Sequence, residues 1–245
     1  MALIPARSGS KRVKNKNINV IGGHPLIAYT ISSAIKANIF DDIIVSTDSE
    51  KYSSIAEYYG AKAPFLRPEK IADDNSPDID WVSFTLDNLE KSYDCFSILR
   101  PTSPFRTANT IKRAWQEFKS KKDIDSLRAV EKCSQHPAKM WKVENGLLNN
   151  ILLGNNNGVP WHSCQYSSLP EIYVQNASLE IAWTRVIYDK QSIAGEKIIP
   201  FFTEDLEGFD INKPQDWVYA NYLIKERKIK QMEINKKPYK NNYDS

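Results

Sequence analysis

The sequence lacks the features on which disulfide-stabilised and membrane-spanning proteins depend. Its three cysteines, Cys95, Cys133 and Cys164, are widely separated and form neither a CxxC pair nor an even disulfide framework, which suits a reducing compartment. No apolar run approaches the roughly 20 residues that cross a bilayer, and no signal peptide is recognisable at the amino terminus. We therefore expect a cytoplasmic protein with no membrane partner.

The chain also lacks a strong charge of one sign. Its net charge is +3, and residues 225–245 contain seven Lys or Arg against three Asp or Glu, so the rest of the chain is close to neutral. A near-neutral body argues against a nucleic-acid-binding surface that covers the whole protein. The basic tail is typical of a solvated helix end and a loose terminus, and we expect no nucleic-acid partner.

Apolar residues alternate between strand-like runs and helical spacing up to about residue 132. This alternation predicts βαβ units, a mostly parallel sheet and the α/β class. Gly60 is placed to end the second helix, Ser76 and Pro77 to cap and begin the third, and Thr107 to start the fourth. The expected strands are 2–4, 43–45, an edge strand at 63–66 and 96–99; the expected helices are 27–35, 52–59, 77–89 and 107–118.

The pattern changes after residue 132. A hairpin is predicted around 144–146, followed by a polar loop at 154–158 and a strand at 179–183. Further strands are expected at 198–202 and 209–211, and a last helix starting at Lys213 with Asn212 as its cap. We expect one domain over residues 1–225, with an antiparallel excursion at about 135–200 serving as a lid or dimer arm, and a basic tail at 226–245.

The densest charge in the chain lies just after the first predicted strand. Residues 7–16, the basic loop, contain five Lys or Arg, no acidic residue and a small Ser-Gly-Ser turn. Backbone N–H groups and basic side chains in such a loop can surround a phosphate. The loop is neither a Walker A sequence nor a GxGxxG dinucleotide fingerprint. The competing interpretation is that residues 7–16 form a plain solvated loop. An anion site is favoured because these residues follow a strand of an α/β sheet, where ligands commonly bind.

Several short motifs occur in an order that resembles the acylneuraminate cytidylyltransferases, over roughly residues 2–220. That family contains the CMP-sialic acid synthetases and relatives acting on legionaminic, pseudaminic and 3-deoxy-octulosonic acids. The first block is highly specific and the others support it. The motifs are IPARSGSK at 4–11 continuing to KNI at 16–18, GHPLI at 23–27, VSTD at 45–48, 61–68 ending in Arg-Pro, LRPTSPFR at 99–106, His136-Pro137, Leu169-Pro170 with Asn176, and DINKPQDW at 210–217.

The resemblance implies a Rossmann-like three-layer nucleotidyltransferase fold with a small antiparallel dimerisation excursion. It also implies the reaction: the anomeric hydroxyl of a 2-keto-3-deoxy sugar acid attacks the α-phosphorus of CTP, giving CMP-sugar and pyrophosphate with Mg²⁺. Such products serve surface glycans such as lipopolysaccharide or capsule. A homodimer is likewise implied.

The resemblance assigns the CTP half of the reaction to the basic loop and to a few later residues. Fixed cations and backbone donors are needed where charge builds on the triphosphate. The catalytic residues implied are Arg7, Lys11, Lys16 and Asp210; the CTP contacts implied are Ala6, Arg7, Ser10, Lys11, Lys16, Asn17, Arg67 at the base, and Ser76.

Asp210 is the candidate Mg²⁺ ligand, because this ion commonly takes one or two carboxylates plus phosphate oxygens. The family often has a second Asp where this chain has Asn212. Asn212 is open to three roles: a ligand through its amide oxygen, a ligand through water, or only the helix cap.

The sugar-acid half departs from the family pattern. Many members have an Arg before a Gln-Asp-Leu-Pro segment, whereas residues 162–170 here contain no Arg and one apparent extra residue. Lys139 is a replacement candidate for holding the substrate carboxylate, and Arg100 stands where Gln is common. The expected sugar-acid contacts are Arg100, Ser103, Lys139, Gln165 and Asn176.

Other functions remain open at this point. One is a nucleotidyltransferase using another nucleotide or a sugar phosphate, and another is an inactive basic RNA- or partner-binding protein. The histidines His24, His136 and His162 show no metal-ligand spacing, and no nucleophile set is evident. His24 is expected to have a structural role.

Overall fold

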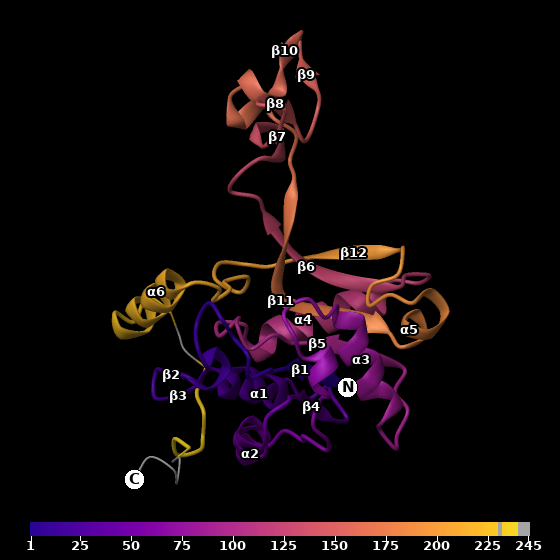
Figure 1. Cartoon of the computed structure of the whole chain (residues 1–245), viewed down its shortest axis with the longest axis vertical. Helices are drawn as coiled ribbons and strands as arrows, with labels where there is room; N and C mark the ends of the chain where they lie inside the picture. The colour runs from indigo at the N-terminus through magenta and orange to yellow at the C-terminus, as the bar shows by residue number, and fades with distance from the viewer. Residues whose placement is uncertain (230–231, 240–245) are drawn as a thin grey trace. The chain divides into compact units, whose positions relative to one another are not determined.

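The computed structural model describes residues 1–229 and 232–239. In these residues six strands form one sheet in the order β12-β6-β11-β5-β1-β4 (Figure 1). β1 pairs in parallel with both β4 and β5, whereas β11 is antiparallel to β5. The predicted α/β class is confirmed. The strands are β1 (Ala2–Pro5), β4 (Ile43–Ser46), β5 (Cys95–Ile98), β6 (Ser126–Lys132), β11 (Tyr173–Trp183) and β12 (Ile198–Phe202).

Helices cover both faces of this sheet, which gives the three layers expected. Successive side chains of a strand point to opposite faces. Ala2 and Ile4 pack in a core with α1 (Leu26–Ala37), α2 (Glu50–Tyr59) and α4 (Ala108–Ser120). Leu3 packs in a second core with α3 (Asp78–Asp87) and α5 (Arg185–Lys190). A third core joins α1 to α6 (Pro214–Lys225) and to Ile211.

Two predicted helix boundaries are confirmed and two are wrong. Gly60 ends α2 with a φ of 100°, and Thr107 caps α4. α3 starts after Pro77, one residue later than predicted, and Ser76 is not its cap. Asn212 is not the cap of α6, which begins after Lys213.

The reason for both errors is a carboxylate that satisfies backbone groups in place of the expected cap. Asp216 accepts the backbone N–H groups of Asn212 (2.8 Å) and Lys213 (2.7 Å). Asp73 accepts the backbone N–H of Ser76 at 2.9 Å. Each carboxylate fixes the chain ahead of the helix, so the helix begins later.

Three other segments differ from the prediction. Residues 63–66 are not a strand, although isolated parallel bridges join Lys62 to Ile44 and Leu66 to Thr47 at the sheet edge. Residues 209–211 are irregular, and β6 and α5 were not predicted. A short two-stranded hairpin, β2 (Val20–Ile21) and β3 (His24–Pro25), precedes α1.

The chain divides into two compact units. The first contains residues 1–129 and the described residues from 176 onward, and the second contains residues 130–175. Residues 176–200, predicted to belong to the excursion, therefore lie in the first unit. No helix in the described ranges is long and apolar enough to cross a membrane.

The second unit contains two small hairpins and short 3-10 turns, together with the end of β6 and the start of β11. The predicted hairpin is present as β7 (Trp141–Glu144) and β8 (Leu147–Asn150). The expected polar loop at 154–158 instead lies in a further hairpin of β9 (Asn155–Asn156) and β10 (Val159–Pro160). Both turns are Asn-Gly pairs with positive φ, the conformation of tight hairpin turns. Exposed apolar side chains of this unit include Val143, Leu147, Leu148, Ile151 and Leu153.

Part of the basic tail contacts the helices of the first unit. The Tyr58 hydroxyl donates to the carbonyl of Lys237 at 3.0 Å, and the N–H of Tyr239 donates to the Tyr59 hydroxyl at 3.1 Å. Ile234 and Tyr239 pack against the larger core. Residues 232–239 are thus held on α2, and the remaining tail residues 230–231 and 240–245 lie outside the described chain.

Asp125 fixes the connection between α5 and β12. Its buried carboxylate accepts the N–H groups of Glu196 (2.9 Å) and Lys197 (3.1 Å) and the Lys190 ammonium (3.0 Å). Gly195, with a φ of +68°, lets the chain pass close, because a Cβ there would lie 2.6 Å from the Cβ of Asp125. Hydrogen bonds from Glu196 and Lys197, and then Lys190, hold the pKa of Asp125 well below its ordinary value.

We expect Asp125→Asn to lower the free energy of unfolding by about 2 kcal/mol at neutral pH, the scale of hydrogen bonds to a buried charge. A depressed folded-state pKa stabilises the protein above the unfolded pKa of ~3.9, and this contribution is lost as the pH falls. The difference between variant and wild type should therefore shrink below about pH 4. Urea titrations at several pH values measure it, and a difference that persists unchanged at pH 3 contradicts the ionic role.

Candidate functional site

The basic loop follows β1, and hydrogen bonds to Asp48 and from Asn17 hold its first residues in place. The backbone N–H of Ser8 donates to Asp48 at 2.7 Å, and its hydroxyl donates to the same carboxylate at 2.8 Å. Buried Asn17 donates its amide to the carbonyl of Arg7 at 3.2 Å. Asp48 follows β4, so the loop is tied to the end of the neighbouring strand.

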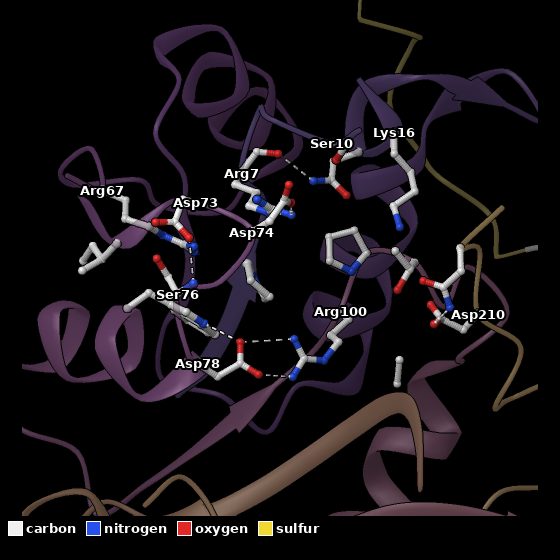
Figure 2. Close-up of a pocket in the computed structure, with 18 residues that line it drawn as sticks. Arg7, Ser10, Lys16, Arg67, Asp73, Asp74, Ser76, Asp78, Arg100 and Asp210 are labelled. Carbon is white, nitrogen blue, oxygen red and sulfur yellow. Dashed lines mark hydrogen bonds and ion pairs between the residues drawn. The ribbon is translucent and has the colours of Figure 1, made fainter. Parts of the chain in front are cut away.

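The three parallel strands β1, β4 and β5 each contribute to one pocket of about 300 Å³. Arg7 follows β1, Ser46 at the end of β4 holds Arg67, and Arg100 follows β5. Ligands of α/β sheets bind at such carboxyl ends. Figure 2 shows Arg7, Lys16, Arg67, Arg100 and Asp210 around this space. The lining includes Ser10, Asn17, Asp73, Asp74, Ser76, Asp78, Trp81, Thr102, Ala177 and Asn212.

Two cations of the basic loop share a carboxylate. Arg7 forms an ion pair with Asp74, and the Lys11 ammonium lies 2.7 Å from the other oxygen of the same carboxylate. Hydrogen bonds from Lys11 and Arg7 hold the pKa of Asp74 at about 2. Lys11 is 81% exposed and lines an adjoining hollow that shares Arg7, Ser10, Lys16 and Asp74 with the pocket.

Arg67 is buried in the pocket wall. Its guanidinium donates to the hydroxyl (3.1 Å) and carbonyl (2.9 Å) of Ser46 and lies over the Trp81 ring at 5.0 Å. Burial lowers the pKa of Arg67 to about 10, which leaves it charged at neutral pH. Ser76 lines the same pocket, so the two residues expected at the nucleotide base are brought together.

Asp210 and Lys16 bring distant parts of the chain to the opposite wall. The Lys16 ammonium donates to the carbonyl of Ile211 at 2.8 Å. Burial lowers the pKa of Lys16, and the charge of Asp210 opposes that shift. One oxygen of Asp210 accepts the Asn212 amide, whereas its buried Oδ1 receives no hydrogen bond from any described residue.

This arrangement fits a Mg²⁺ ion with one protein carboxylate. Burying a carboxylate oxygen that accepts no hydrogen bond costs free energy, and a bound cation would offset that cost. Among residues 1–229 and 232–239, no group of three or more His, Cys, Asp or Glu side chains is arranged to hold a metal. The phosphate oxygens of a nucleotide would therefore have to supply further ligands, as Mg²⁺ commonly requires.

Arg100 is already paired. Its guanidinium lies 2.6 Å from Asp78 and 3.1 Å from Glu180, and Arg128 lies 3.1 Å from Glu180. Burial opposes the charge of Arg100, but the bonds and charges of Asp78 and Glu180 outweigh it and raise its pKa. Two arginines and two carboxylates thus neutralise one another beside the pocket.

The other expected site residues lie elsewhere. Ala6, which directly precedes the basic loop, is fully buried. Ser103 is buried outside the pocket lining, and Asn176 donates to Thr203 at 2.8 Å, also outside it. Lys139 and Gln165 belong to the second unit, where Lys139 donates to the carbonyls of His162 (3.1 Å) and Cys164 (2.7 Å). The pocket itself is lined by residues of the first unit.

Two histidines have structural partners. His24 lies 3.0 Å from the Tyr59 hydroxyl. His136 accepts the N–H of Ala138 at 3.1 Å and lies 2.9 Å from the carbonyl of Pro170.

Sequence reasoning missed the acidic wall of the pocket, formed by Asp73, Asp74 and Asp78. These residues lie in a short segment rich in Asp that follows Arg67-Pro68. The sequence does contain a signal for this wall. A run of acidic residues in a chain with one strongly basic loop suggests that the acidic run and the basic loop form ion pairs. Helix N-capping alone does not explain three carboxylates there.

The model of a family described as cytidylyltransferase matches residues 1–178. A CMP-N,N'-diacetyllegionaminic acid synthase of Legionella pneumophila is 33% identical over 229 residues, which cover 91% of this chain and 95% of that protein. An N-acylneuraminate cytidylyltransferase of Escherichia coli is 38% identical over 135 residues, which cover 55% of this chain and 32% of that protein.

A solved structure shares the fold. A CMP:2-keto-3-deoxy-manno-octonic acid synthetase complexed with CTP superposes with a TM-score of 0.68 at 15% identity, over 92% of this chain and 98% of that one. At that level of identity the likeness concerns the arrangement of the elements.

Proposed function

Because the chain belongs to the cytidylyltransferase family, we propose that it transfers CMP from CTP to a nonulosonic acid. The observation that carries this proposal is the convergence of the basic loop, Arg67 and Asp210 on one pocket at the carboxyl ends of parallel strands. Relatives that act on legionaminic and N-acylneuraminic acids support the class of acceptor.

The bond changes of the proposed reaction are simple. The anomeric hydroxyl oxygen bonds to the α-phosphorus of CTP, the bond from that phosphorus to the bridging oxygen breaks, and the hydroxyl proton passes to water. Pyrophosphate carries away the electron pair of the broken bond. Catalysis then depends on positioning and on stabilising the charge that builds on the leaving group.

The donor half uses residues of the first unit in this proposal. Arg7, Lys11 and Lys16 neutralise the triphosphate, and backbone N–H groups of the basic loop add further donors. Arg67 and Ser76 contact the cytosine edge. Asp210 would hold Mg²⁺, which would neutralise phosphate charge. The buried Oδ1 of Asp210, which receives no hydrogen bond from a described residue, supports this role.

The acceptor half needs a cation for the carboxylate of the sugar acid. Arg100 is neutralised by Asp78 and Glu180, so it is a poor sole counterion for the sugar carboxylate. Among the described residues no carboxylate pairs with Lys139, whose ammonium contacts only carbonyl oxygens. We therefore favour Lys139 for that carboxylate, together with Gln165, which follows the Cys164 whose carbonyl accepts a hydrogen bond from Lys139.

A homodimer is part of the proposal. In the second unit the side chains of Val143 (69%), Leu147 (69%) and Leu153 (79%) are exposed to solvent. Clusters of exposed apolar side chains commonly mark surfaces that bind another protein. Contact of this unit with a second copy would cover these side chains. Sedimentation of the purified protein tests this, and a fully active monomer contradicts it.

The test of the proposed function is a substrate panel with CTP and Mg²⁺. Sialic, legionaminic, pseudaminic and octulosonic acids are each supplied, and pyrophosphate release and the CMP-sugar are measured. We expect release with CTP and at least one nonulosonic acid, and none without an acid. Release with GTP or UTP but not CTP contradicts the donor assignment, whereas RNA binding without release from any nucleotide contradicts the enzyme.

A further inference from the structure

Asp74 lies between two cations of the basic loop, in a position that suits an anion. Its Oδ1 bonds Arg7 and its Oδ2 lies 2.7 Å from the Lys11 ammonium, so one carboxylate bridges two cations. A phosphate group would present two oxygens to the same cations in a similar way. Asp74 borders the pocket (Figure 2) and also the adjoining hollow.

The segment that carries Asp74 is held in place by bonds on either side of it. Asp73 accepts the backbone N–H groups of Asn75 (2.6 Å) and Ser76 (2.9 Å), which fixes a tight turn. Arg7 also donates to the carbonyl of Ala72 at 3.4 Å. Asp74 is therefore not a freely moving surface carboxylate, and a bound triphosphate would remain close to it.

A carboxylate in that position acts on an incoming nucleotide in two ways. It must release Arg7 and Lys11, a cost that is the same for every triphosphate. It also repels the negative charge that takes its place, and this cost grows with the charge of the ligand. Free CTP carries more negative charge than its magnesium complex, so the repulsion falls mainly on the free form.

We propose that Asp74 is a specificity-determining residue of the donor site, which makes the basic loop accept the metal complex of the nucleotide in preference to the free nucleotide. This inference rests on the proposed function, because it takes CTP as the ligand. It concerns how the site selects the form of its donor, and it places Asp74 among neither the metal ligands nor the reacting groups.

The test measures CTP affinity by calorimetry for wild type and Asp74→Asn, once with EDTA and once with excess Mg²⁺. Asparagine keeps the size of the side chain and removes its charge. We expect free CTP to bind about tenfold more tightly to the variant and the magnesium complex only about threefold more tightly. In turnover, free CTP added beyond the available Mg²⁺ should inhibit the variant more strongly than wild type, while kcat at saturation with the magnesium complex changes less than about threefold.

Glu69→Gln is the matched control. Glu69 lies on the same stretch of chain, is exposed, and borders neither the pocket nor the adjoining hollow. This variant removes the same charge and should leave both affinities within about twofold of wild type, since exposed charges are screened.

The outcomes separate the two levels of the proposal. Wild type that binds no CTP with or without Mg²⁺ overturns the proposed function. Wild type that binds CTP while Asp74→Asn gains nothing, or gains equally for both forms, overturns the role of Asp74 alone. An equal gain in Glu69→Gln also overturns it, because the effect would then come from net charge.

Discussion

Asp210→Asn is expected to lower kcat of cytidylyl transfer by about 10²-fold or more, the scale of losing a group that stabilises the transition state through a bound cation. The carboxylate presents a buried oxygen that no described residue satisfies, and asparagine offers a neutral and weaker ligand for a hard cation. Pyrophosphate release measured over a range of Mg²⁺ concentrations should show a higher requirement for the metal as well as a lower rate.

Asp205→Asn is the control for that measurement. Asp205 is exposed on the same connection between β12 and α6 and does not border the pocket. It should retain wild-type kcat and metal requirement. An Asp210→Asn enzyme with normal kcat and normal dependence on Mg²⁺ refutes ligation by Asp210.

Lys16→Ala is expected to reduce kcat/KM by about 10²-fold, whereas Lys11→Ala should cost about tenfold or less. Both lysines belong to the basic loop, but their surroundings differ. The Lys16 ammonium is shielded between the loop and the Asp210 segment, at 2.8 Å from the carbonyl of Ile211. Lys11 is 81% exposed, and charges in water interact weakly because solvent and salt screen them.

The comparison of the two variants is informative because each removes the same charge. Pyrophosphate release at several CTP concentrations gives kcat/KM for each, and thermal unfolding shows whether Lys16→Ala remains folded. A larger loss for Lys11→Ala than for Lys16→Ala would mean that the loop closes over the triphosphate and buries Lys11. That result would contradict the prediction that Lys16 contributes more to kcat/KM than Lys11.

Local patterns predicted the regular elements well, since burial on one face of a helix or strand is visible in the order of apolar residues. Tyr52, Ile55 and Tyr59 indicated α2, and Gly60 indicated its end. The two wrong helix caps fall where a side chain other than the expected cap satisfies the backbone. Asp216 bonds the chain ahead of α6, so the cap expected at Asn212 is not needed. The order of apolar residues does not show which of two nearby polar side chains accepts these N–H groups.

The cations of the candidate site were predicted from the sequence, but the carboxylates that pair with them were not. Arg7, Lys16, Arg67 and Asp210 were named from motifs, and the structure brings them to one pocket. The partners that set their charge were not named. Asp74 neutralises part of the basic loop, and Asp78 with Glu180 occupies Arg100. These pairs join residues 22 to 80 positions apart.

The sequence by itself determined the α/β class, the anion-binding character of residues 7–16 and the likeness to the cytidylyltransferases, because each depends on residues adjacent in the chain. Only the tertiary structure decided which of the site's cations are paired with a carboxylate. Parallel pairing of β1 with β4 and β5 brings three strand ends together, and the acidic turn at 72–76 then meets the basic loop. The electrostatic state of a cation depends on what lies within a few ångströms of it, and that distance is a property of the fold.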